Sequence, residues 1–187
     1  MVGTSGATKL HSPDLVKRYI KHQYGEDVTI VDCEDRNQSY DILGWHNSFS
    51  IRIEYKNRFF YTGISEKHLY QNDILIELIQ TLPYFLSRGI PSNRSIDDLY
   101  EAQKINTALG WFYKCSADRL FYFRFLDDRF FDLSDIGFAL FKPWLLNNLN
   151  RFSLQYSDKT TGTINLVLPL SDIPKPLISR LNRNRSE

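Results

Sequence analysis

The chain of 187 residues is long enough to build one domain around a hydrophobic core and too short for two comfortable ones. Apolar residues make up 42% of it and charged residues 24%, with 13 Phe and 11 Tyr, which argues against a disordered chain and for an aromatic-rich folded domain. The formal net charge of +1 argues against a generally basic nucleic-acid-binding protein and leaves only local basic surface to meet phosphates.

The cysteines and the hydropathy bear on the compartment. Cys33 and Cys115 lie far apart and lack the spacing of a metal site. No signal peptide or long apolar run precedes the domain, so we expect a reduced, cytoplasmic protein without a membrane span. Both cysteines are then expected to be small buried hydrophobic residues.

The first predicted element is a helix. Residues 1–11 are mostly small and polar and are expected to form a flexible arm. Ser12 and Pro13 are a helix start, and Gly25 follows the last apolar residue of a helical pattern. The opposite face of this helix is basic and either contacts phosphates or is simply solvated. Its basic residues are Lys17, Arg18 and Lys21.

A predicted hairpin follows a short strand at Val28–Cys33. Its first strand is the apolar run Tyr40–Leu43, and turn-type residues separate this run from the second strand. From Phe49 to Lys56 apolar and polar residues alternate, so that one face of the second strand is core and the other is polar. The turn-type residues are Gly44, His46, Asn47 and Ser48.

Three side chains of this hairpin point to chemistry. Residues two apart on a strand share a face, so Glu54 and Lys56 stand side by side. Strand pairing can bring Asp41 close to both of them. Two carboxylates can hold a hard divalent cation such as Mg²⁺, which activates water and neutralises phosphate charge, while the lysine orients the nucleophile. The other reading of the same pattern is an ordinary charged face on a solvated edge strand.

Asp41, followed 13 positions later by Glu54-Tyr55-Lys56 on a hairpin after a helix, resembles the PD-(D/E)XK nuclease superfamily. The resemblance implies an α/β (α+β) single domain of the restriction-endonuclease-like fold, a central mixed sheet flanked by helices. It implies Asp41 and Glu54 as metal ligands and Lys56 as the catalytic lysine. Tyr40 stands where a proline often precedes the aspartate. The likeness extends over about residues 15–126 and is sharp only at these three residues.

Other acidic residues are candidates for a further ligand. Asp14 lies in the first predicted helix, and Glu26 follows that helix. Glu77 is the odd member of Asp73–Ile79, a dense aliphatic run typical of a strand buried on both faces, where a carboxylate needs a partner. It is either an extra partner for the metal or the lysine, or a residue facing an edge. From 81 to 106 we expect a loop with one helix near 96–105, inserted between sheet elements.

The second half of the chain predicts further strands. Phe121, Phe123 and Phe125 share one strand face, and a turn at 127–128 leads into a second strand at 130–133. Asp118 is either catalytic or, as we prefer, a structural cap. Ser134 is expected to cap a helix that is interrupted at Pro143. A C-terminal hairpin is expected from 152–156 and 163–168.

The predicted domain spans residues 12–173, and 174–187 forms a basic tail that either grips a nucleic-acid backbone or is solvated. Gly-rich phosphate loops, Ser-His-Asp spacing and zinc clusters are absent from the sequence. The sequence thus predicts a Mg²⁺-dependent endonuclease, with Mn²⁺ able to substitute, that cuts duplex or branched DNA as a homodimer. The alternatives are a non-catalytic binding protein that keeps the nuclease fold, and the same site acting on RNA.

Overall fold

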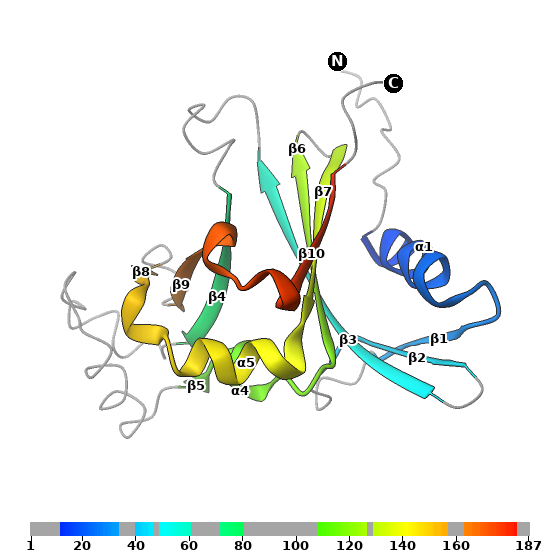
Figure 1. Cartoon of the computed structure of the whole chain (residues 1–187), viewed down its shortest axis with the longest axis horizontal. Coiled ribbons are helices and arrows are strands. Elements are labelled where there is room, and N and C mark those ends of the chain that lie inside the picture. The colour runs from blue at the N-terminus through cyan, green and yellow to red at the C-terminus, as the bar shows by residue number, and fades with distance from the viewer. Residues whose placement is uncertain are drawn as a thin grey trace, which may run out of the picture.

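Two β-sheets form the framework of the molecule (Figure 1). The computed structural model describes residues 12–33, 40–46, 49–60, 72–80, 108–126, 129–156 and 163–182. Helix α1 (Ser12–Tyr24) lies against one face of the larger sheet, and helix α5 (Phe138–Leu146) and the smaller sheet lie on the other. The predicted mixed α/β architecture in a single domain is therefore confirmed.

The larger sheet has six strands in the order β1-β2-β3-β6-β7-β10. All neighbours are antiparallel except β3 and β6, which are parallel. Parallel strands need a long connection, and the connection between β3 and β6 contains further strands and a short helix. The strands are β1 (Thr29–Asp32), β2 (Ile42–His46), β3 (Phe49–Phe60), β6 (Arg119–Leu126), β7 (Arg129–Gly137) and β10 (Ile178–Asn182).

The smaller sheet is antiparallel and has the strand order β5-β4-β9-β8. A short helix, α4 (Trp111–Lys114), follows β5 and leads into β6 of the larger sheet. The hairpin β8–β9 confirms the C-terminal hairpin predicted from the sequence. The strands are β4 (Asp73–Gln80), β5 (Ala108–Leu109), β8 (Ser153–Tyr156) and β9 (Thr163–Pro169).

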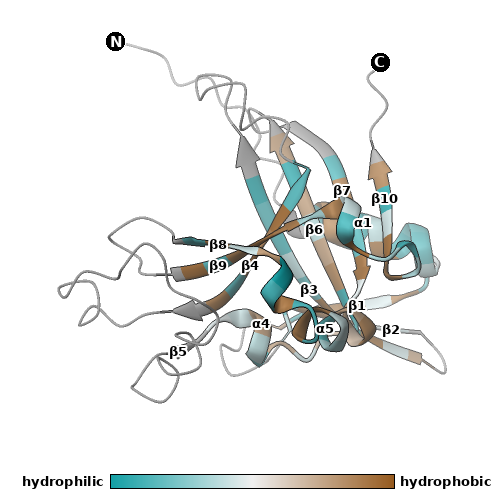
Figure 2. Cartoon of the chain, turned by 60° about the vertical axis from the view of Figure 1, so that its left-hand side comes forward, coloured by the Kyte–Doolittle hydropathy of each residue, from teal (hydrophilic) through white to brown (hydrophobic). Residues whose placement is uncertain are grey.

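Helix α1 covers an apolar core on one face of the six-stranded sheet. Val16 and Ile20 are fully buried there against Ile53 and Phe121, as the helical spacing of the apolar residues predicts. The helix ends at Tyr24 and is followed by Gly25, whose φ of 108° suits glycine and whose N–H donates to the Lys21 carbonyl at 2.8 Å. Figure 2 shows hydrophobic and hydrophilic residues interleaved along the strands beneath it.

The hairpin of β2 and β3 has the pairing that brings Asp41 beside the centre of β3. Ile42 pairs with Ile53, and the register runs to His46 opposite Phe49. Strand β2 therefore continues through Gly44, which the sequence places in the turn. A Cβ on Gly44 would lie 3.2 Å from the Ile51 side chain, so glycine suits this crowded position inside the sheet.

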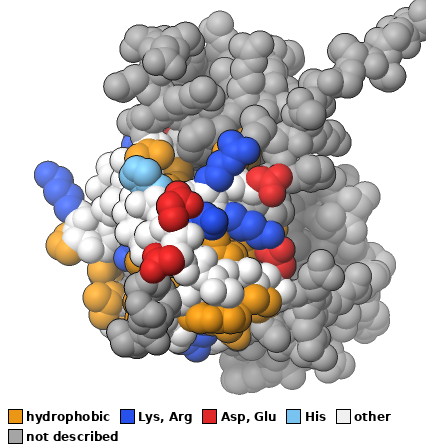
Figure 3. All heavy atoms as spheres, turned by 90° about the vertical axis from the view of Figure 1, so that its right-hand side faces the viewer, with side chains coloured by type: hydrophobic (Ala, Val, Ile, Leu, Met, Phe, Trp, Pro, Cys, Tyr) orange, Lys and Arg blue, Asp and Glu red, His pale blue; other side chains and the backbone are white. Residues whose placement is uncertain are grey.

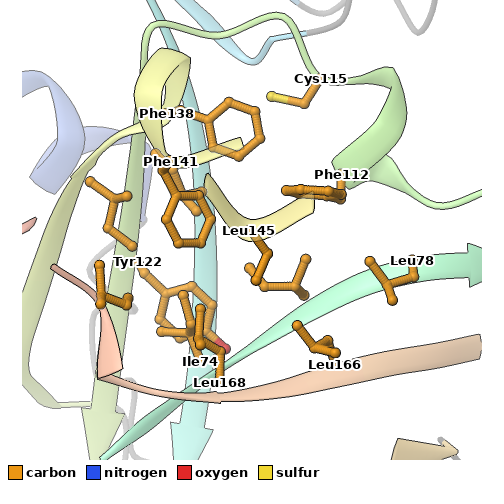
Figure 4. Close-up of a cluster of buried hydrophobic side chains, with 14 of the residues drawn as sticks. Ile74, Leu78, Phe112, Cys115, Tyr122, Phe138, Phe141, Leu145, Leu166 and Leu168 are labelled. Carbon is orange, nitrogen blue, oxygen red and sulfur yellow. The ribbon is translucent and has the colours of Figure 1, made fainter. Parts of the chain in front are cut away.

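A second core fills the space between the six-stranded sheet, α5 and the smaller sheet (Figure 4). Phe112, Phe138 and Phe141 pack there, with ring centroids of neighbouring pairs about 6 Å apart. Strand β4 buries Ile74 and Ile76 in this core but leaves Leu75 and Glu77 half-buried. The prediction that β4 is buried on both faces is therefore wrong, because only its alternate residues face the core.

Two other predictions about the second half of the chain differ from the structure. Ser134 lies inside β7 and not at a helix start, because it is buried and accepts a hydrogen bond from Arg124 Nη1 at 3.2 Å. Helix α5 begins instead after Gly137 and contains Pro143. Residues 178–182, placed by the sequence in a basic tail, form edge strand β10, which pairs with β7.

Several predictions lie outside the described residues. These are the flexible arm at 1–11, the loop and helix between 81 and 106, the turn at 127–128, and the end of the basic tail at 183–187. In the described part of the chain, no helix has the length and apolar character needed to cross a membrane.

Candidate active site

The structure brings Asp41, Glu54 and Lys56 together on one face of the β2–β3 hairpin. Asp41 directly precedes β2, and its N–H donates to the Ile53 carbonyl at 2.9 Å. Its carboxylate Oδ2 accepts a hydrogen bond from the Tyr55 N–H, also at 2.9 Å. These two contacts span the hairpin and hold the Asp41 side chain beside Glu54.

Glu54 and Lys56 project from β3 toward α4, away from α1. Lys56 Nζ donates to Glu54 Oε1 in an ion pair. The Glu54 side chain is only 8% exposed, whereas the Lys56 side chain is 30% exposed. An exposed edge pair would leave both groups in water, so this burial favours a built site over an ordinary solvated strand face.

The electrostatics of the three groups show a crowded pair of carboxylates. Burial raises the pKa of Glu54, and the Asp41 carboxyl, within hydrogen-bonding reach, raises it further against the opposing effect of Lys56. For Lys56, burial lowers the pKa, but the charges of Glu54 and Asp41 outweigh burial and the net pKa is raised. A cation between the two carboxylates would relieve the repulsion that raises the pKa of Glu54.

This donor set fits a magnesium-type ion. Mg²⁺ is usually held by one or two carboxylates, with waters and substrate phosphate oxygens completing its coordination. Among the residues that the structure describes, no group of three His, Cys, Asp or Glu side chains is arranged to hold a metal. As a pair of carboxylates, Asp41 and Glu54 leave most of the coordination to water and substrate, which suits an open site better than a closed structural zinc site.

The segment from α4 to β6 lies next to the side chains of Glu54 and Lys56. The ring of Trp111 lies over Lys56, with 5.0 Å between Nζ and the ring centroid. Cys115 is buried nearby, and burial together with the Glu54 charge raises the pKa of its thiol to about 12. The thiol stays protonated and is no nucleophile at neutral pH. Cys115 is buried as expected, whereas Cys33 is only half-buried.

The additional acidic candidates do not join the carboxylate pair. Asp14 is exposed on α1, and Glu26 pairs with Lys21 at 3.6 Å beyond the end of that helix. Helix α1 packs on the opposite face of the sheet from Glu54. Glu77 reaches the α4 segment instead, where its Oε1 accepts a hydrogen bond from the Trp111 N–H at 3.4 Å.

Asp118 has structural contacts, but its side chain does not form the predicted cap. Its carboxylate accepts hydrogen bonds from the N–H of Arg52 at 2.8 Å and from the Arg52 guanidinium at 2.8 and 3.2 Å. The same hydrogen bonds lower the pKa of Asp118. Its backbone carbonyl accepts from the N–H groups of Phe138 and Ala139, so the main chain and not the side chain caps α5.

The basic face of α1 is partly neutralised by acidic neighbours. Lys17 Nζ lies 2.5 Å from Asp32 Oδ2, and Lys21 pairs with Glu26. Figure 3 shows basic and acidic side chains next to one another on this side of the molecule. These pairs favour a solvated face over a phosphate-binding one.

Trp111 is the site residue that the sequence analysis missed. Helix α4 is only four residues long, too short for a helical period to be read. The aromatic residues after Gly110 were a signal of burial, but their position over β3 depends on contacts between distant segments.

Comparison of the sequence with models of known protein families gives no match. No characterised protein matches the sequence either. The interpretation of the site therefore rests on its geometry and its electrostatics.

Proposed function

We propose that the protein is a Mg²⁺-dependent endonuclease that hydrolyses phosphodiester bonds of DNA at Asp41, Glu54 and Lys56. The observation that carries the proposal is the convergence of two carboxylates and an ammonium, one of the carboxylates buried, on one face of a hairpin. Two carboxylates crowded together in a buried setting favour a bound cation. The lysine beside them supplies a positive charge for a phosphate.

Each residue has a distinct part in the reaction. Asp41 and Glu54 would hold Mg²⁺, and the Tyr55 N–H fixes the orientation of the Asp41 carboxylate. The ion, when bound, lowers the pKa of a water and offsets negative charge on the phosphate, and Mn²⁺ can substitute for it. The Lys56 ammonium orients the attacking water and stabilises charge that develops on the phosphate oxygens.

The finer fold assignment, restriction-endonuclease-like, is part of the same proposal. It is supported by the order of elements: α1, then the antiparallel strands β1, β2 and β3, then a crossover to the parallel strand β6. The three site residues lie on the central hairpin of this arrangement. The crossover builds α4 and the strands β4 and β5 of the smaller sheet, whose other strands, β8 and β9, follow α5.

The substrate class and assembly follow from the chemistry. A single carboxylate pair cuts one strand, so cleavage of both strands of a duplex requires two copies of the site. We therefore propose a twofold homodimer acting on duplex or branched DNA.

The test is cleavage of labelled duplex, branched and single-stranded DNA, and of RNA, with and without Mg²⁺. We expect metal-dependent DNA cleavage that Asp41→Asn, Glu54→Gln and Lys56→Met each lower by about 10²- to 10³-fold. Asp32→Asn, a change at the surface pair with Lys17, is the matched control and should keep activity. Cleavage of RNA but not of DNA would show that the substrate of the site is RNA. Binding of nucleic acid without any cleavage would overturn the proposed endonuclease activity and favour a non-catalytic binding protein.

A further inference from the structure

Helix α4 places an aromatic ring over the lysine of the candidate site. Trp111 opens this four-residue helix, and the Lys56 ammonium lies 5.0 Å from its ring centroid. A cation within about 6 Å of an indole face is attracted by the ring's negative electrostatic surface, most strongly when water is excluded. Lys56 is thus held between the Glu54 carboxylate and the Trp111 ring.

The start of α4 is fixed to β4 by contacts that leave Trp111 little freedom. The Gly110 N–H donates to the Leu78 carbonyl at 2.8 Å, and the Trp111 N–H donates to Glu77 Oε1 at 3.4 Å. A Cβ on Gly110 would lie 2.4 Å from the Glu77 carbonyl oxygen, so only glycine allows this close approach. The sequence Gly110-Trp111 therefore sets the position of the ring.

The end of α4 is fixed to α5. Lys142 Nζ donates hydrogen bonds to the carbonyls of Tyr113 and Cys115, at 2.9 and 2.8 Å. These carbonyls lie in the last turn of α4 and at the residue that follows it, where helical partners are lacking. The indole itself packs against Phe138 at the start of α5, with 6.1 Å between ring centroids. Two separate elements thus hold a helix too short to be stable by itself.

We infer that Trp111 is a positioning residue that keeps the Lys56 ammonium over the carboxylate pair. The Glu54–Lys56 ion pair alone does not achieve this, because a carboxylate that holds a metal ion offers less to the lysine. The attraction between the Trp111 ring and Lys56 does not depend on the Glu54 carboxylate. It therefore keeps Lys56 at the site when Glu54 binds a metal ion. The expected effect on the rate of cleavage rests on the proposed nuclease function. The expected effect on the position of Lys56 does not depend on that function.

The test compares two tryptophans that pack against the same core. Trp111→Leu removes the ring over Lys56, and Trp111→Phe retains an aromatic face. Trp144→Leu is the matched control, because Trp144, in α5, packs on Phe141 of the same helix and on Phe152 beyond its end. Should Trp111→Leu fail to fold, Trp111→Met fills the same space with a flexible side chain and no ring.

The direct readout is the rate at which an activated ester acetylates Lys56 in the metal-free protein, measured by peptide mass spectrometry. The exposed Lys175 serves as the internal reference. We expect Trp111→Leu to raise the relative rate at Lys56 by about 2- to 30-fold, and Trp111→Phe to restore most of the protection. An unchanged rate in Trp111→Leu, or an equal rise in Trp144→Leu, would overturn the inference.

The second readout is kinetic. We expect Trp111→Leu to lower kcat by about 3- to 30-fold with KM within about 2-fold, and to have no further effect in a Lys56→Met background. An added loss in that background would contradict action through Lys56. If no nucleic acid is cleaved by the wild-type protein, the proposed function fails while the acetylation result still decides the role of Trp111.

Discussion

Two charged clusters lie on the same face of the six-stranded sheet, and they differ in the sign of their excess charge. At the centre of β3, the carboxylates of Asp41 and Glu54 share the single ammonium of Lys56. Two residues further along β3, Arg58 pairs with Asp73. This second pair belongs to a cluster in which carboxylates are outnumbered by arginines.

The second cluster is a structural anchor. The carboxylate of Asp132 accepts hydrogen bonds from Arg124 and, at 3.0 Å, from Arg180, which joins three neighbouring strands of the sheet. Arg124 and Asp132 are each only 2% exposed. Arg124 also donates to the backbone carbonyl of Asp73 at 3.5 Å, which links the two sheets.

The two clusters differ in how completely their carboxylates are neutralised. In the arginine cluster, the carboxylates are already neutralised by fixed guanidinium groups, so no further cation is called for. In the Asp41 cluster, one positive charge serves two carboxylates, and burial raises the pKa of Glu54. Changes in the arginine cluster should therefore cost stability, and changes in the Asp41 cluster should cost function.

The largest expected effect on stability is in the arginine cluster. Asp132→Ala leaves Arg124 buried without its carboxylate, which should lower the free energy of unfolding by about 3 to 5 kcal/mol. Urea unfolding followed by circular dichroism measures the loss. The double change Arg124→Met and Asp132→Leu, which removes both charges, should recover most of it. A loss below about 1 kcal/mol in Asp132→Ala would remove the distinction between the clusters.

The carboxylate cluster should show the opposite behaviour. Glu54→Gln should lower cleavage by about 10²- to 10³-fold while changing the free energy of unfolding by less than about 1 kcal/mol. Because the folded state raises the pKa of Glu54, wild-type stability should fall relative to Glu54→Gln as the pH rises above the ordinary glutamate value. Unfolding at a series of pH values measures this difference. A difference that shrinks with rising pH would contradict the assigned environment.

A smaller effect is expected where β3 meets β6. Asp118→Asn weakens the pairing with Arg52 and should lower the free energy of unfolding by about 1 kcal/mol, since both side chains are more than a third exposed. The folded-state pKa of Asp118 is lowered, so its contribution is present above the ordinary aspartate pKa and is lost as the pH falls through the lowered value. The stability difference from wild type should therefore vanish in acid, and one that persists there would indicate lost packing and not a lost charge pair.

The smallest effect is expected on the surface of α1. Lys17→Met removes an exposed ion pair with Asp32 and should change the free energy of unfolding by less than about 0.5 kcal/mol. Thermal unfolding at low and high salt is the measurement. A loss above about 1 kcal/mol would show that exposure is a poor guide to which ion pairs matter in this protein.

The closeness of the three candidate side chains could be predicted because it depends on neighbouring strands of one hairpin. Alternation along β3 assigns Glu54 and Lys56 to one face, and a hairpin register places Asp41 beside them. The cover over the site was not predictable, because Trp111 reaches it through the contacts of Gly110 with β4 and of Lys142 with α4.

The same distinction explains the failures elsewhere in the fold. Serine is a common residue at the start of a helix, which is why Ser134 was predicted to cap one. In the structure the Ser134 hydroxyl instead accepts a hydrogen bond from the buried Arg124 of the neighbouring strand β6. Strand β10 has no clear alternation and forms because β7 offers it an edge. In both cases the deciding partner is distant in the sequence.

Calorimetric titration of the metal-free protein with Mn²⁺ tests the central claim most directly, with Asp41→Asn and Asp132→Asn compared at equal folded fraction. The account predicts saturable binding to the wild-type protein that is lost in Asp41→Asn and kept in Asp132→Asn. Binding that survives Asp41→Asn unchanged, or no binding by the wild-type protein, would contradict a cation site between Asp41 and Glu54.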